Sequence, residues 1–154
     1  MKPVTQLNNQ TDAVAEAITR VLADTYAVYF KTHAFHWNVE GINFHTLHTL
    51  FEEQYTEMWQ AIDVIAERIR MLDSYAPSSY NQMAAITTIE DTVTPPSDID
   101  MLKQLITDHE KLITTLKNSL PIAQQAEDEV SVGILLQRME IHEKTLWMLK
   151  SLTK

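Results

Sequence analysis

Histidine and carboxylate side chains crowd one short stretch of this chain, "HAFHWNVEGINFHTLHTLFEEQY", residues 33–55. Four of the chain's six histidines fall there, together with several glutamates. Imidazole nitrogen and carboxylate oxygen are ligands for divalent transition metals. The chain has no cysteine, which excludes disulfides, iron–sulfur clusters, thiolate zinc sites and thiol catalysis. The stretch is therefore either a metal site built from nitrogen and oxygen, or the polar side of two helices that meet at a turn.

Two pairs of candidate ligands have the spacing of neighbours on one helix face. His48 and Glu52 are four residues apart, as are Asp63 and Glu67, so each pair projects two ligand groups in one direction. The pairs lie 11 residues apart. This spacing returns to nearly the same face about 16 Å further along the helix, too far for one ion. Either there are two independent sites, or an antiparallel copy of the helix brings one pair against the other across a symmetry axis.

The usual di-iron bundle separates these alternatives, because it carries a Glu-x-x-His pair on each of two helices within one subunit. Neither His109 nor His142 has a glutamate three positions earlier. The ligand set of a single bundle is therefore missing, which favours a site shared between subunits. His36, at the end of the preceding helix, would supply a further imidazole close to the same turn.

The composition is that of one globular domain. A chain of 154 residues, 45% hydrophobic, with two glycines and five prolines, is long enough for its own core. We expect a single domain over residues 1–154, with residues 1–10 as a short N-terminal tail. No secretion signal or membrane span is evident, so we expect a soluble cytoplasmic protein. The formal net charge of −9 attracts cations and repels membranes and nucleic acids.

Apolar residues recur every three or four positions, the period of amphipathic helices, and no segment has the alternation of a strand. The pattern predicts long helices over residues 12–37, from an Asn43 cap to Leu72, from a Ser97 cap onwards, and after the turn at 126–131. Pro121 should kink or end the third of these. Residues 73–97 form a long crossover with one short helix near 80–86. This is the all-α layout of a ferritin-like four-helix bundle.

Five segments, "HWNVEG", "LHTLFEEQY", "DVIAERIRMLD", "DHEKLI" and "HEKTLWML", resemble in order and spacing the Dps family of mini-ferritins (DNA-binding proteins from starved cells). The resemblance covers roughly residues 15–152. It implies a twelve-subunit cage with ferroxidase centres between two subunits. His36 and His48 would be the imidazole ligands, and Asp63 and Glu67 the carboxylates from the partner subunit. Glu52 stands where many members have aspartate.

The activity implied by this resemblance is oxidation of Fe(II) by hydrogen peroxide, with Fe(III) mineral stored in the cage and the cell protected from oxidative damage. A nucleoid protein that compacts DNA is the alternative, and a helical scaffold with structural histidines is a third. Members of the family also have an acidic pore that admits Fe(II). Glu127, Asp128 and Glu129 would be its carboxylates here. The dipole of the following helix also favours negative charge at its start, and the two interpretations are compatible. Gly133 stands where a number of members have another pore aspartate.

The remaining histidines and tryptophans have less distinctive settings. His45 fits a surface or interface position better than a weak metal contact. His33 lies near the expected site but is not assigned as a ligand. His109 and His142 open two similar "HEK" segments, and we interpret them as bundle-facing or interface polar groups. Trp59 and Trp147 fit the core or an interface.

DNA binding is expected to be weak or absent. DNA-binding members of the family usually carry a lysine-rich tail, whereas the ends of this chain offer only Lys2, Lys150 and Lys154. A strongly negative cage with so few tail cations neutralises few phosphates. We expect no retardation of plasmid in gel-shift experiments at low ionic strength and about pH 7.5. Retention of plasmid that weakens steeply with added salt would instead support the nucleoid alternative.

Overall fold

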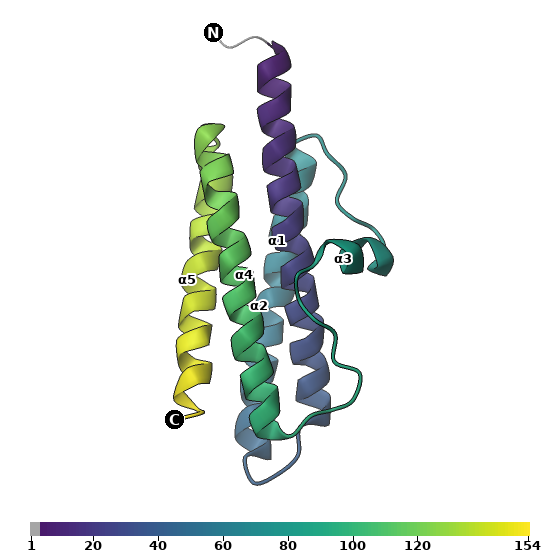
Figure 1. The fold of residues 1–154 in the computed structure, drawn as a ribbon, viewed down its shortest axis with the longest axis vertical. Coiled ribbons are helices and arrows are strands. Elements are labelled where there is room, and N and C mark those ends of the chain that lie inside the picture. Colours follow the sequence, from purple (N-terminus) through teal and green to yellow (C-terminus); the bar gives the residue numbers. More distant parts are fainter. Residues whose placement is uncertain (1–3) are drawn as a thin grey trace.

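The computed structural model describes residues 4–154, with side chains from residue 9 onwards. The described residues contain no strand and five helices: α1 (Val4–Asn38), α2 (Phe44–Met71), α3 (Tyr80–Ile86), α4 (Asp98–Gln125) and α5 (Glu129–Ser151). The four long helices lie side by side as two antiparallel hairpins, α1 with α2 and α4 with α5 (Figure 1). The long connection that holds α3 carries the chain back along the bundle, so α2 and α4 run in the same direction (Figure 1). The predicted all-α bundle with its long crossover is confirmed.

Some helix ends differ from the sequence prediction. α1 begins at Val4, so residues 4–10, expected in a tail, are helical. Asn43 precedes α2, but its side chain makes no capping hydrogen bond. Ser97 does cap α4, because its Oγ accepts a hydrogen bond from the amide of Asp100 at 3.2 Å. The short helix α3 occupies the residues predicted for it.

Pro121 lies inside α4, which continues to Gln125. Proline has no amide hydrogen, so the helix gives up one hydrogen bond at this position. The residues around and beyond it still pack: Ala123 is buried, and Leu120 and Ile122 lie against the same core. Burial of these side chains offsets the lost bond. Of the two expected effects of Pro121, a kink or an end of the helix, the structure excludes the end.

Buried apolar side chains form two clusters along the bundle. The larger draws on all four long helices and on the crossover; its buried members include Ile18, Leu22, Met58, Ile65, Ile69, Ile89, Leu112, Leu116 and Leu135. The smaller lies towards the end where α1 leads into α2, and it consists of Phe35, Val39, Leu47, Phe51, Met101, Leu102, Leu105 and Leu149. The second cluster therefore fixes the part of the bundle that carries the histidine-rich stretch.

A buried polar layer lies between the two clusters. Lys31 of α1 pairs with Asp108 of α4 at 2.8 Å, and both side chains are almost fully buried. Burial raises the pKa of Asp108, and Lys31 opposes that shift. A buried ion pair adds little net stability after desolvation, but removing one partner leaves an uncompensated charge and is costly. The pair therefore specifies how α1 and α4 align.

The same layer contains a chain of hydrogen bonds from α2 through α5 to α4. Arg138 donates two bonds to Glu57, at 2.6 and 2.8 Å. Its Nη2 also donates to Nε2 of His142 at 3.0 Å, and Nδ1 of His142 lies 3.1 Å from Nδ1 of His109. Burial is the main cause of the lowered pKa of both histidines, to about 4 for His109. Both rings face the bundle interior, as the sequence interpretation allowed.

Asp24 anchors the crossover to the bundle. This buried carboxylate on α1 accepts hydrogen bonds from the hydroxyls of Thr87, Thr88 and Thr115 and from the amide of Thr88, at distances of 2.6 to 2.9 Å. Thr87 and Thr88 directly follow α3, whereas Thr115 belongs to α4. One carboxylate therefore joins α1, the crossover and α4.

Asp128 joins α5 to α2. Its carboxylate caps α5 by accepting from the amide and hydroxyl of Ser131 at 3.0 and 2.6 Å, and it pairs with Arg68 at 2.7 Å. Burial alone would raise the pKa of Asp128, but the bonds from Ser131 and Arg68 outweigh it and the pKa is lowered. Of the three expected pore carboxylates, Asp128 is therefore engaged within the protomer, while Glu127 and Glu129 are exposed.

The tryptophans expected in the core or an interface lie at the surface of the protomer. Trp59 is 62% exposed and Trp147 is 64% exposed, which excludes a core position for either. Within the described part of the chain, no helix combines the length and the apolar character needed to cross a membrane.

The buried histidine pair predicts a pH dependence of stability. Because the pKa of both rings is lower in the folded protein, the unfolded chain takes up protons that the folded chain does not as pH falls below about 6.5. The stability of the neutral pair is fully present above that pH and is lost towards pH 4. Two protons give a slope of up to about 2.7 kcal/mol per pH unit. We expect the thermal midpoint of the metal-free protein to fall between about pH 6.5 and 5.

Replacing one ring tests this assignment. His109→Gln should flatten the pH dependence in that window, whereas the matched change His45→Gln, at an exposed position, should leave it unaltered. Equal slopes for the wild type and His109→Gln would contradict the assignment.

Candidate metal centre

His36 and His48 come together where α1 ends and α2 begins. His36 lies in the last turn of α1 and His48 in the second turn of α2. Their rings stack with centroids 3.8 Å apart and planes inclined by 14°. Nδ1 of His36 lies 2.7 Å from the carbonyl oxygen of His48, and Nδ1 of His48 lies 2.7 Å from that of His36. Each residue therefore holds the ring of the other in place.

These reciprocal contacts fix the tautomer of both rings. A carbonyl oxygen only accepts hydrogen bonds, so each Nδ1 must carry a hydrogen. In the neutral ring, Nε2 then keeps its lone pair. A backbone carbonyl is a usual partner for the second nitrogen of a metal-binding histidine, because it orients the ring and raises its basicity. In the neutral rings of His36 and His48, both Nε2 atoms can therefore bind a metal ion through their lone pairs.

Aromatic rings enclose this pair. Phe44 stacks on His48 with centroids 4.9 Å apart, and Tyr55 meets His36 edge-on at 5.2 Å. His33 in turn stacks on Tyr55, with ring centroids 4.0 Å apart. Its pKa is lowered, mainly by burial and also by the nearby His36. His33 therefore packs beside the pair. Tyr55 was predicted only as part of the apolar face of this helix and not as part of the site, although its position seven residues after His48 places it on the same side of the helix.

The carboxylates expected in the site are all on α2 and all exposed. Glu52 lies one turn beyond His48, and Asp63 and Glu67 lie about three and about four turns further towards the end of the helix. Across residues 4–154, no three histidine, aspartate or glutamate side chains gather closely enough to hold a metal ion. The structure thus brings together the two imidazoles but not the carboxylates. One protomer presents the two parts of the predicted ligand set at separate places on its surface.

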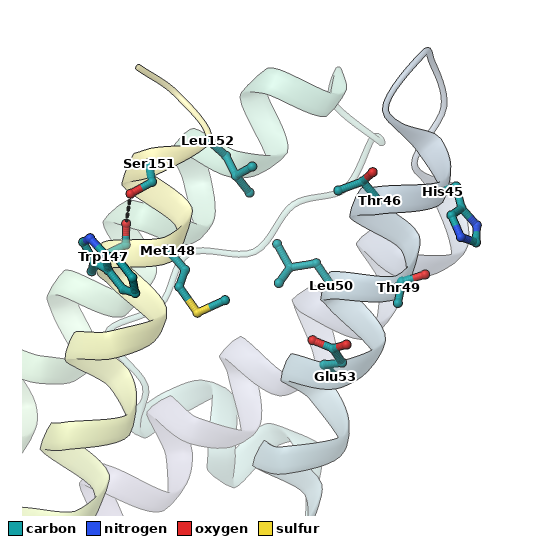
Figure 2. A pocket seen from close by; sticks show the side chains of 9 residues that line it. All are labelled: His45, Thr46, Thr49, Leu50, Glu53, Trp147, Met148, Ser151 and Leu152. Atoms are coloured by element: carbon teal, nitrogen blue, oxygen red, sulfur yellow. Dashed lines mark hydrogen bonds between the residues drawn. The ribbon is translucent and has the colours of Figure 1, made fainter.

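A groove of about 490 Å³ lies at the end of the bundle, between the start of α2 and the end of α5. Leu50 of α2 faces Met148 of α5 and Leu152, which directly follows α5, across it (Figure 2). Its lining includes one imidazole, from His45, and one carboxylate, from Glu53. The groove is mostly apolar and lacks converging ligand groups, so it is not the metal centre. His45 is exposed, as expected for a surface histidine.

Comparisons of the sequence and of the structure with known proteins agree with one another. Residues 15–154 match the family model of the ferritin-like domain. The chain is 34% identical over 138 residues to DNA protection during starvation protein 2 of Bacillus anthracis, covering 90% of this chain and 94% of that protein. Its structure resembles a Dps protein of Bacillus brevis, with a TM-score of 0.91, 31% identity and full coverage of both chains.

A Dps protein of Vibrio cholerae O1, reported as a member of a broad superfamily of ferritin-like diiron-carboxylate proteins, is similarly close in structure. The TM-score is 0.92 at 27% identity, covering 96% of this chain and 92% of that one.

Proposed function

The chain belongs to the Dps family of ferritin-like proteins, whose general role is iron storage and protection, and we propose that it oxidises Fe(II) with hydrogen peroxide at a site shared between two subunits. The Fe(III) product would be stored as mineral in a hollow dodecamer. The observation that carries this proposal is the pair of stacked imidazoles. Nδ1 of each ring is hydrogen-bonded to a backbone carbonyl, which leaves the lone pair of Nε2 to bind a metal ion.

The site is completed by a second copy of the chain. His36, His48 and Glu52 of one subunit would face Asp63 and Glu67 of its partner, because a twofold axis across α2 sets the start of one helix against the end of the other. Large apolar side chains beside the distant carboxylates support such a contact: Trp59 is 62% exposed and Val64 is 52% exposed. A partner that covers these side chains would also deliver the missing ligands.

Mixed nitrogen and oxygen donors suit iron in both oxidation states. Two Fe(II) ions each lose one electron, the O–O bond of peroxide breaks, and two protons complete two molecules of water. The carboxylates of Asp63 and Glu67 offset the positive charge that grows as Fe(III) forms. Since both electrons pass to one peroxide molecule, no hydroxyl radical is released. This accounts for protection together with storage.

The proposed site requires an oligomer. We expect light scattering of the purified protein to show a closed assembly of about twelve subunits of 17.7 kDa each. An isolated monomer would leave half of a ligand set and the apolar surface of α2 in water. A stable monomer at micromolar concentration would remove both the cage and the shared site.

Mixed assemblies test the sharing directly. His48→Ala and Asp63→Ala should each abolish fast Fe(II) oxidation, and neither should prevent assembly. Oxidation is measured as the rise of ferric absorbance when peroxide is added to protein that has been loaded with Fe(II) under anaerobic conditions. In a dimer of one subunit of each kind, one site lacks both ligands and the other is intact. Co-assembly of the two inactive variants should therefore restore part of the activity.

Subunits that all carry the same lesion provide the control, because refolding them together should restore nothing. If the ligands came from single subunits, every site in the mixture would carry one lesion. Absence of recovery in assemblies shown to contain both variants would therefore count against the shared site.

A further inference from the structure

A continuous row of aromatic rings leads from the imidazole pair to the crossover. Tyr55 of α2 meets His36 with ring centroids 5.2 Å apart, and Tyr29 of α1 lies 6.4 Å from Tyr55. Tyr26 follows at 5.8 Å from Tyr29, and Tyr80 of α3 follows at 6.3 Å from Tyr26. These separations are those of aromatic rings in contact, so an electron can pass from each ring to the next. We call Tyr55, Tyr29, Tyr26 and Tyr80 the tyrosine row.

The tyrosine row concentrates oxidisable rings on one side of the imidazole pair. It holds four of the chain's five tyrosines. On the other side of the pair, Phe44 stacks on the ring of His48. Phenylalanine has no hydroxyl and is much harder to oxidise than tyrosine. An electron drawn towards the imidazole pair therefore comes from the side of Tyr55.

The far end of the row is where an oxidised ring is most stable. A phenol that loses an electron becomes strongly acidic, so the oxidised ring persists where water can take its proton. Tyr80 is 76% exposed, whereas the other three rings of the row are half-buried. Burial is the main cause of the raised pKa of Tyr26, which disfavours loss of a proton there. Oxidation that begins at Tyr55 therefore ends at Tyr80.

We propose that the tyrosine row supplies the second electron to peroxide when a site holds only one Fe(II) ion, with Tyr80 as the surface end of the route. Fe(II) loses one electron, and the phenol of Tyr80 loses the other through the row and releases its proton to water. Peroxide takes up two electrons and two protons, its O–O bond breaks, and two molecules of water form. One Fe(III) ion and one neutral tyrosyl radical remain, and no hydroxyl radical is released.

The proposal rests on the proposed function, in which peroxide is the oxidant, but the row can be tested in the assembled protein without metal. Azide radicals generated by an electron pulse oxidise tryptophan in preference to tyrosine, and absorbance distinguishes the two protein radicals. Trp37 touches the row through His33, whose ring centroid lies 4.3 Å from that of Trp37 and 4.0 Å from that of Tyr55. We expect a tyrosyl radical to rise as the tryptophanyl radical decays, at a rate independent of protein concentration.

Two variants and two matched controls identify the route. Trp37→Phe and Tyr55→Phe should each remove the fast step. Trp147→Phe and Tyr75→Phe should retain it, because both residues lie outside the row. The controls are as accessible as their counterparts: Trp37 is 57% exposed and Trp147 is 64% exposed, and Tyr75, like Tyr80, lies in water. A fast step that survives Trp37→Phe or Tyr55→Phe overturns the proposal.

A soluble reductant locates the end of the route. Ascorbate reduces an exposed tyrosyl radical faster than a half-buried one. Tyr29→Phe interrupts the row and Tyr80→Phe removes its exposed end, so each should slow the decay of the tyrosyl radical in ascorbate. Tyr75→Phe should decay as the wild type does. Equal decay in the wild type and Tyr80→Phe also overturns the proposal.

A shortage of Fe(II) tests the role of the row. When peroxide is added to assembled protein that holds fewer Fe(II) ions than sites, Tyr55→Phe should release more hydroxyl radical to a spin trap than the wild type or Tyr75→Phe. Equal release from all three overturns the proposal. Absence of Fe(II) oxidation in the wild type would instead contradict the proposed function, and it would leave the metal-free result unchanged.

Discussion

The two hydrogen bonds that His36 and His48 exchange through their backbone carbonyls are the constraint on which the proposed metal site depends. They tie ring orientation and tautomer to the relative position of two helices. Any shift of α1 along α2 would move each carbonyl away from the ring that it holds. The small apolar cluster resists such a shift, because Phe35 of α1 and Phe51 of α2 are both buried in it. Packing in the core thus sets the direction of two lone pairs at its edge.

Apart from Asp24, which is held by threonine hydroxyls and an amide, the charged groups in the interior of the bundle are paired or neutral. Lys31 and Asp108 neutralise each other, and the two buried histidines are held neutral. Among the side chains that the structure describes, the one remaining buried cation is Arg138, which pairs with the carboxylate of Glu57. In the usual di-iron bundle this region is occupied by ligands from four helices. Here the carboxylates with ligand spacing are exposed on the outer surface of α2, which agrees with the proposal that the metal site lies at the contact between two subunits.

The sequence predicted those features that depend on local spacing. The four long helices, the limits of α3 and the capping by Ser97 follow from periodicity and turn chemistry. The proximity of His36 and His48 follows from a short turn between two helices. The reciprocal bonds could not be predicted, because they depend on how the two helices pack. The role of Asp24 and the pairing of Asp128 with Arg68 were missed for the same reason, since these partners are distant in sequence.

Asp24 also has a consequence for the order in which the chain folds. Its donors are separated from it by 63 to 91 residues, so no local segment can satisfy the carboxylate. A lone hairpin of α1 and α2 would have to keep this charge in water, because burying it without partners is unfavourable. Desolvation of Asp24 must therefore coincide with arrival of both the crossover and α4. Such long-range closure slows folding, and it makes the final packing of α1 depend on docking of the crossover and of α4.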